Sequence, residues 1–277
     1  MFRMIGSELK KYCYLPYMLI VLLGVICLGF AGTVYDPSGM PMTIAQLMIQ
    51  YFSGEELMSI SYSGVIIWSS SLSSWLSVFL PLILTLSYIS VLSDERQNGL
   101  VQFELIRSGN LRYCVSKVLS GAFYGGLAFL ISYAILGGIF MVVFPSISAF
   151  PVEEQAIFLR TSLSLYLLKR LVGSFFYGVF ASMFGIGVSI FFRDKYMLLC
   201  LPFLLNYIYE QMLMKMVMKL GMTNMELSEW LNWFYPSQIA NVSMNRYWIT
   251  VVLLVMGVYI GLVVLFYQKV KRGKWIG

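Results

Sequence analysis

Six long apolar stretches constrain this chain more than any other feature of its 277 residues. Each holds about 20 or more mostly apolar residues, the length that an α-helix needs to cross the ~30 Å hydrocarbon core of a bilayer. The stretches are 15–34, 66–92, 117–144, 171–192, 196–214 and 247–267. The pattern predicts an all-α integral membrane protein with six transmembrane helices.

The composition excludes most soluble functions. Only 12% of the residues are charged and 59% are hydrophobic, whereas soluble domains carry about a quarter charged residues. A soluble enzyme and a nucleic-acid-binding module are therefore excluded, despite a sequence pI of about 9.0. The chain has no histidine, so histidine-based catalysis and the usual zinc sites are also excluded. Cys13, Cys27, Cys114 and Cys200 show no metal-ligand or disulfide spacing, and we expect free thiols and no metal site.

The basic residues predict the orientation of the chain. With six spans, 13 of the 19 Lys and Arg residues fall in one set of connecting segments and 6 in the other. Because cytoplasmic loops carry the excess of Lys and Arg, both termini are expected in the cytoplasm of a bacterial-type plasma membrane. We interpret stretch 15–34 as a retained helix, since it is too long for the apolar core of a signal peptide. The pair Lys169–Arg170, on the outer side just before the fourth span, is a local exception.

The chain is expected to form a single membrane domain, residues 1–277. Segment 1–14 reads as a short amphipathic N-terminal segment, and 93–112 as a cytoplasmic loop. Segment 215–246 continues the fifth span as an amphipathic stretch, in which Met214, Met218, Met222 and Met225 share a helical face. This segment is expected to lie in the outer interface or to re-enter it.

The loop between the second and third spans is the most informative segment. Asn98–Gly99 breaks the preceding helix, and a short amphipathic helix can start there. Leu100, Phe103, Ile106 and Arg107 then share one face. Charged groups surround this face: Glu95, Arg96, Glu104 and Arg112. An apolar knob within a charged rim suits docking into a groove of another protein, while the alternative is a solvated inner loop.

This loop resembles the type-2 ABC transporter permease family. Glu95, Arg96 and Gly99, followed by the run 103–106 and then by Arg112 and Lys117 at the start of the third span, are similar to a pattern that the family carries between the second and third of its six spans. The six-span layout, the cytoplasmic termini and the amphipathic N-terminal segment also match, so the resemblance covers most of the chain. The sequence departs from the family at Leu100, where a small hydroxyl residue is usual, and at Ser108–Gly109, where a proline is common.

The resemblance implies that the loop is a coupling helix that contacts a separate ATPase. It assigns the contact to Glu95, Arg96, Gly99, Leu100, Phe103, Glu104, Ile106 and Arg107. Two ATPase subunits would carry ATP and Mg²⁺, and a second permease subunit, expected as a homodimer, would complete the pathway. The chain itself is expected to be no enzyme and to bind no cofactor. Its single Gly-Lys pair, Gly273–Lys274, precedes Trp275, so no phosphate-binding loop is present.

The second span has a hydroxyl-rich face, formed by Ser70, Ser74, Ser77, Pro81, Thr85 and Tyr88. This face either packs closely against a neighbouring helix or lines a translocation path with Pro81 as a hinge. Small residues four apart predict close helix contacts elsewhere. They are Gly121 and Gly125, then Ser174, Gly178 and Ser182, and finally Gly257 and Gly261.

The fifth span places Pro202, Asn206 and Glu210 on one face at four-residue spacing. A carboxyl group inside a membrane is costly and is a candidate for function, so Asn206 and Glu210 are candidate residues of the translocation path. Lys215, Lys169 and Arg170 are candidate partners for Glu210; the alternative is that the span ends early and Glu210 lies at the interface.

These observations together predict the membrane-spanning subunit of an ATP-driven exporter, surrounded by lipid. The 45 aromatic residues and 18 methionines suit an amphipathic cargo, with a peptide as the first choice, then a drug or a lipid-linked glycan. An ion-coupled secondary transporter is the alternative, for which Glu210 is the available intramembrane carboxylate. A membrane enzyme is a weaker alternative.

Overall fold

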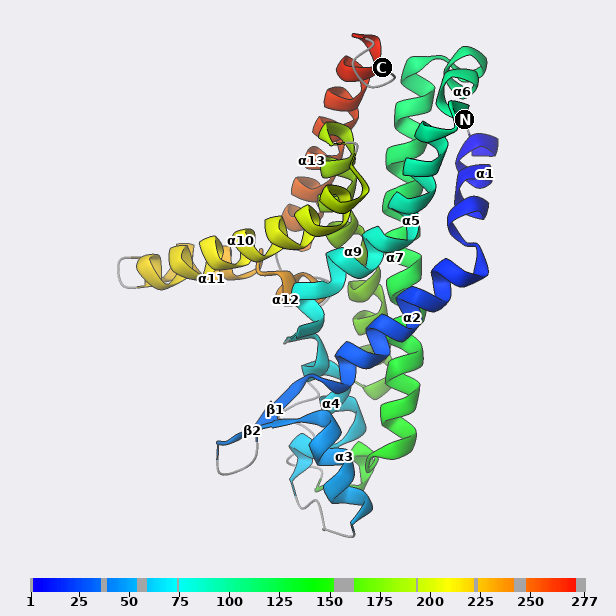
Figure 1. Cartoon of the computed structure of the whole chain (residues 1–277). Helices are drawn as coiled ribbons and strands as arrows, with labels where there is room; N and C mark the ends of the chain where they lie inside the picture. Colours follow the sequence, from blue (N-terminus) through cyan, green and yellow to red (C-terminus); the bar gives the residue numbers. More distant parts are fainter. Residues whose placement is uncertain are drawn as a thin grey trace.

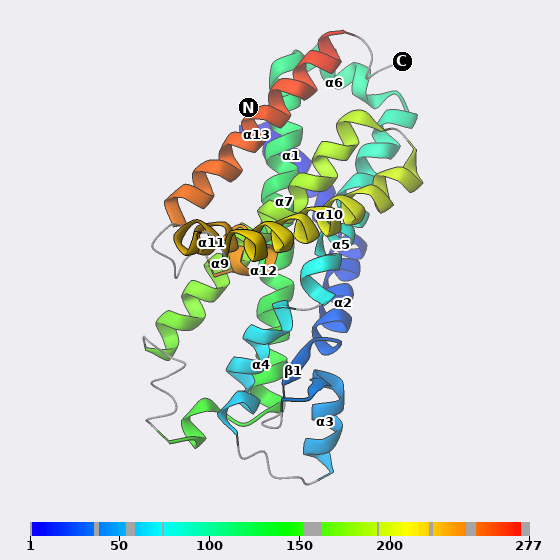
Figure 2. The ribbon, with the colours of Figure 1, turned by 90° about the vertical axis from the view of Figure 1, so that its left-hand side faces the viewer.

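The computed structural model describes residues 2–35, 39–53, 59–73, 75–151, 162–192, 194–221, 224–241 and 248–272. Its long helices form an elongated bundle in which α5 (Trp75–Gln97), α7 (Asn110–Val143) and α13 (Trp248–Lys271) follow the long axis (Figure 1). The N-terminus and the C-terminal end of α13 lie at the same end of the bundle as α6 (Leu100–Ser108) (Figures 1 and 2).

Most described residues are helical. The remaining helices are α1 (Phe2–Tyr12), α2 (Leu15–Phe30), α3 (Ile44–Phe52), α4 (Gly64–Ser70), α9 (Leu163–Phe191), α10 (Lys195–Gly221), α11 (Met225–Asn232) and α12 (Pro236–Ile239), with short 3-10 turns η1 (Ile60–Tyr62), η2 (Ser71–Ser73) and η3 (Ile147–Ala149). Within the described ranges, five helices are long and apolar enough to cross a membrane: α5, α7, α9, α10 and α13. These helices are compatible with a multi-pass membrane protein. α7 has 34 residues, about 51 Å at ~1.5 Å per residue.

The first predicted span, 15–34, is shorter than expected and follows α1 at a bend. α2 ends at Phe30, and it meets α1 at 62°, so that these two helices together make a sixth candidate span. Pro16 occupies the first turn of α2, and Tyr14 before it is extended. A proline at that position starts a helix but cannot continue the preceding one, which explains the bend (Figure 1).

A small hairpin follows α2, where the sequence pattern predicted no strand. β1 (Thr33–Tyr35) pairs antiparallel with β2 (Pro41–Thr43), with Val34 opposite Met42. Thr43 then caps α3 by a reciprocal pair of hydrogen bonds with Gln46. The hairpin, α3 and α4 lie at the end of the bundle opposite α6 (Figure 1).

The second predicted span, 66–92, is not one helix, and the prediction of a continuous span there is wrong. The hydroxyls of Ser69, Ser70 and Ser71 each donate to the carbonyl three residues earlier at 2.8–2.9 Å. The guanidinium of Arg170 donates a hydrogen bond to the Ser69 carbonyl at 2.5 Å. In a continuous helix this carbonyl would instead accept from the backbone N–H four residues later. α4 therefore ends at Ser70, and α5 begins as a separate helix.

α9 begins at Leu163, eight residues before the predicted start of the fourth span. Lys169 and Arg170 lie inside this helix and not before it, contrary to the prediction, and Arg170 is buried. Its guanidinium also donates to Tyr133 at 3.3 Å and to the side chain of Asn241.

The expected amphipathic stretch after the fifth span turns back on itself. α10 ends at Gly221, and Met225 opens α11, so a single helix through Met225 is wrong. α11 packs along α10, and Figures 1 and 2 show α10 crossing the long axis of the bundle. Of segment 215–246, the structure describes 215–221 and 224–241; Met222 and 242–246 lie outside the described residues.

The contact between α7 and α9 forms the centre of the bundle. A Cβ on Gly125 would lie 2.6 Å from the Cβ of Ser182 and 2.9 Å from the Gly178 carbonyl oxygen. A Cβ on Gly178 would overlap the Gly125 carbonyl. The predicted close contact of small residues is confirmed here, whereas Gly257 and Gly261 of α13 face open space.

We expect Gly178→Ala to lower the thermal midpoint of the detergent-solubilised protein, because the backbones of α7 and α9 must separate. Overpacking of this kind costs about 1–3 kcal/mol. Gly257→Ala is the matched control: its Cβ meets nothing within 4 Å, and alanine favours a helix by about 1 kcal/mol over glycine. Equal midpoints for the two variants would contradict this account of the helix contact.

Candidate functional site

α6 forms a short helical step between α5 and α7. Gly99 before it has φ +69° and Gly109 after it has φ +78°, conformations that glycine adopts at little cost. These two turns lay α6 across the end of the bundle (Figure 1). The predicted short helix after Asn98–Gly99 is therefore present.

The outer face of α6 carries large apolar side chains without cover. Leu100, Phe103 and Ile106 are 48%, 72% and 84% exposed, while Val101 and Leu105 on the opposite face are buried. An exposed phenylalanine and isoleucine on a two-turn helix lose the stabilisation, about 1.5–3 kcal/mol each, that burial would bring.

A network of five charged side chains fastens the inner side of α6. We call it the ion cluster: Glu8, Lys11, Glu95, Glu104 and Lys117. The Lys11 ammonium lies 3.0, 2.7 and 2.8 Å from carboxylate oxygens of Glu8, Glu95 and Glu104. The Lys117 ammonium lies 2.6 Å from Glu8 and 3.3 Å from Glu104, and it also bonds to Glu95.

Four helices contribute to the ion cluster: α1 gives Glu8 and Lys11, α5 gives Glu95, α6 gives Glu104, and α7 gives Lys117. The side chains of Glu8, Glu95 and Lys117 are at most 6% exposed. A buried charge is tolerated when opposite charges contact it directly. The ion cluster therefore joins α1, α5, α6 and α7 at one end of the bundle.

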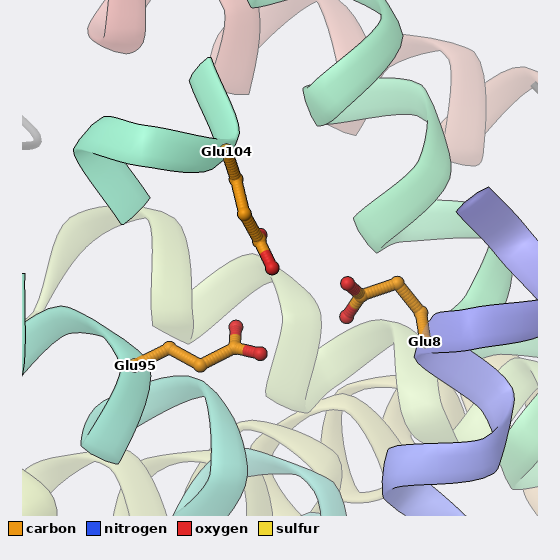
Figure 3. A group of neighbouring side chains, drawn as sticks. All are labelled: Glu8, Glu95 and Glu104. Carbon is orange, nitrogen blue, oxygen red and sulfur yellow. The ribbon is translucent and has the colours of Figure 1, made fainter. Parts of the chain in front are cut away.

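The three carboxylates converge closely enough to resemble a cation site. One oxygen from each of Glu8, Glu95 and Glu104 lies within 4.8 Å of the other two (Figure 3). The two ammonium groups of Lys11 and Lys117 contact all three carboxylates. Two of the three negative charges are thus offset by lysines of the chain itself.

The other charged residues of the loop have different positions. Arg96 donates to the carbonyls of Ser189 and Phe192 at 2.6 and 3.0 Å, at the C-terminal end of α9 where carbonyls lack helical partners. Arg107 is exposed and lines, with Arg3, Glu8 and Glu104, a pocket of about 440 Å³ between α1 and α6. Arg112 is exposed at the start of α7.

The predicted contact residues therefore divide into two groups. Glu95, Arg96 and Glu104 are directed into the protein, where they hold α6 in place. Leu100, Phe103, Ile106 and Arg107 face outward. Sequence analysis missed Glu8, Lys11 and Lys117 as site residues. The spacing of Glu8 and Lys11, three apart on one helix, was the only local signal.

Burial alone would raise the pKa of Glu104. The hydrogen bond from Lys11 and the positive charge of Lys117 outweigh this effect and hold the pKa below its ordinary value. Glu104 is therefore ionised under ordinary conditions, and the attachment of α6 depends on its charge.

A second polar group of residues lies where α5, α9 and α10 meet. Pro81 in α5 has no N–H, so the carbonyl of Ser77 lacks its helical donor. The Tyr177 hydroxyl donates to this carbonyl at 2.9 Å, and the Asn206 amide donates to it at 3.2 Å. Asn206 also donates to the Val78 carbonyl at 3.2 Å.

Glu210 lies one turn beyond Asn206 and is 6% exposed. The hydroxyl of Tyr235 forms a hydrogen bond with its carboxyl group. In the described part of the chain, no ion pair joins Glu210 to Lys215, Lys169 or Arg170. The structure thus brings three of the predicted path residues, Ser77, Asn206 and Glu210, into one region.

The other predicted path residues lie elsewhere. Tyr88 donates to the Ser182 carbonyl at 2.9 Å, and a Cβ on Gly185 would overlap both Thr85 and Tyr88. These two side chains therefore pack tightly against α9. Ser70 bonds within α4, and Ser74 lies outside the described residues.

Comparison with known proteins gives no match: no family model matches the sequence, and neither a curated protein nor a solved structure matches the chain.

Replacing Lys117 tests how much the ion cluster contributes to stability. We expect Lys117→Met to lower the free energy of unfolding by about 3–5 kcal/mol, because it leaves buried carboxylates short of positive charge. Lys195→Met is the matched control, since Lys195 forms an exposed pair with Asp94 at 2.8 Å and exposed pairs contribute about 0–1 kcal/mol. Chemical denaturation in detergent compares the two, and a similar loss for both would refute the assignment.

The charge of Glu104 predicts a dependence on acid. A carboxyl whose pKa is lowered by folding stabilises the fold above its unfolded value, near 4.3. This stabilisation is lost as the pH falls through the folded value. We expect the difference in thermal midpoint between the native protein and Glu104→Gln to be largest near neutral pH and to shrink below about pH 4. A difference that is constant with pH would show that the Glu104 charge contributes nothing.

Proposed function

We propose that the chain is the membrane-spanning permease subunit of an ATP-driven exporter of the type-2 ABC class. In this proposal a separate ATPase docks on α6, and ATP and Mg²⁺ bind to that ATPase. The observation that carries the proposal is the outer face of α6. Phe103 and Ile106 project there from a helix whose inner side is held by the ion cluster.

Rigid attachment favours a mechanical role for α6. A helix of nine residues is marginal on its own, yet Glu104 links α6 to Lys11 of α1 and Lys117 of α7. Glu95 of α5 contacts the same two lysines. A displacement of α6 by the ATPase would thus pass to α1, α5 and α7 together, which supports alternation between inward- and outward-open states.

The rest of the proposal follows the resemblance. Two copies of the chain, surrounded by lipid in a bacterial-type plasma membrane, would pair with two ATPases, and the termini and α6 would lie in the cytoplasm. The start of α1 and the C-terminal end of α13 lie at the same end of the bundle as α6 (Figures 1 and 2), which supports one common side. The cargo we propose is an amphipathic molecule, first a peptide, because aromatic and methionine side chains form adaptable apolar surfaces.

A charge reversal on the outer face of α6 tests the docking. We expect Phe103→Asp combined with Arg107→Glu to abolish co-purification of the ATPase and transport, while the thermal midpoint of the isolated permease stays unchanged. The midpoint should not move because both side chains are exposed. Pull-down of the tagged chain from cells that produce both subunits measures the association.

Met40→Asp serves as the control, because Met40 is 70% exposed directly before β2, and the β1–β2 hairpin lies at the end of the bundle opposite α6 (Figure 1). It should leave both the association and transport intact. Retention of the ATPase by the Phe103/Arg107 double variant would refute docking on α6, and absence of any associated ATPase from the unmodified chain would refute the proposed function itself.

A further inference from the structure

Two buried acceptor atoms on α10 have no donor. The side-chain oxygen Oδ1 of Asn206 and the carboxyl oxygen Oε2 of Glu210 are both inaccessible and form no hydrogen bond. Their residues are 1% and 6% exposed. An unsatisfied buried acceptor costs roughly 1–3 kcal/mol, and more if it is charged. Two of them, one helical turn apart, require an explanation.

The neighbouring donors are already engaged. The Asn206 amide donates to the carbonyls of Ser77 and Val78, and the Tyr177 hydroxyl donates to Ser77. Tyr235 bonds to the carboxyl group of Glu210, but Oε2 is left without a partner.

Among the residues that the structure describes, no lysine or arginine forms an ion pair with Glu210. The groups that interact electrostatically with Glu210 are two phenols, Tyr177 from α9 and Tyr235 before α12. α5 contributes the Ser77 carbonyl, which accepts a hydrogen bond from the Asn206 amide. α11 carries Glu226 and Glu229, both exposed and of the same sign as Glu210. An ionised carboxylate in these surroundings would be buried without an opposite charge, which is strongly unfavourable.

Two cavities of the described structure lie away from the pair. The apolar cavity of about 200 Å³ between α7, α9 and α13 is lined by residues such as Phe123, Phe175 and Val255, and does not reach α10. The pocket beside Arg3 lies at α1 and α6. A proton is the smallest group that can satisfy two acceptors one helical turn apart.

We propose that Glu210 binds a proton in the folded protein and that the resulting carboxylic acid donates a hydrogen bond to Oδ1 of Asn206. Side chains four residues apart on a helix have Cβ atoms about 5–6 Å apart, within reach of such a bond. One proton then satisfies both orphan acceptors and removes the buried charge. Because Asn206 is bonded to the Ser77 and Val78 carbonyls, the proton also fastens α10 to the proline kink of α5. The proposal does not depend on the proposed transport function.

Infrared spectroscopy tests the proton directly. In the difference spectrum between native protein and Glu210→Gln at neutral pH, we expect loss of the carbonyl band of a protonated carboxylic acid. Glu226→Gln is the matched control: its exposed carboxyl should contribute only the bands of a carboxylate. Loss of carboxylate bands alone in Glu210→Gln would overturn the proposal.

A second variant keeps the test valid if Glu210→Gln does not fold. Asn206→Leu retains Glu210 and the side-chain volume but removes the acceptor, so the carboxylic-acid band should shift to higher frequency. An unshifted band would exclude Asn206 as the acceptor.

Thermal unfolding gives an independent reading: the midpoint of the native protein relative to Glu210→Gln should fall as the pH rises. A difference independent of pH would contradict a bound proton.

Discussion

The arrangement of α6 depends on the pairing of three carboxylates with two ammonium groups, of which that of Lys117 is buried. α6 makes too few internal hydrogen bonds to be stable alone, and its large apolar side chains face outward instead of into the core. The contact that holds α6 in place is made by Glu104, which pairs with Lys11 and Lys117. The same two lysines also pair with Glu8 and Glu95. Since these partners come from α1, α5 and α7, the position of one short helix is set by three others.

Distant donors also satisfy the carbonyls at three helix interruptions. The carbonyl freed by Pro81 is bonded by Tyr177 and Asn206. The break after α4 is held by Arg170 on the Ser69 carbonyl, and the end of α9 by Arg96. An unpaired carbonyl in an apolar environment is costly, and at each of these three places the donor comes from a distant part of the chain. The breaks are therefore fixed structural positions.

The long helices, the short helix after Gly99 and the contact of Gly125 with Gly178 could be predicted from the sequence, because each depends on local periodicity or on small residues at helical spacing. The break at Ser69–Ser71 could not, since it requires Arg170, about a hundred residues later. The ion cluster was missed for the same reason: Lys117 meets Glu8 across 109 residues. Charge counts placed both residues on one side of the membrane, but pairing is decided by tertiary packing.

The ion cluster and Glu210 are two solutions to one electrostatic problem. At the end of α6, two lysines offset two of the three carboxylate charges, and the lowered pKa of Glu104 keeps the attachment at ordinary pH. Along α10, a buried carboxyl meets only phenols, an amide and carbonyls, and a bound proton is the remaining way to remove its charge. The contact of α6 with the bundle is thus governed by paired charges, and that of α10 by the occupancy of a single proton.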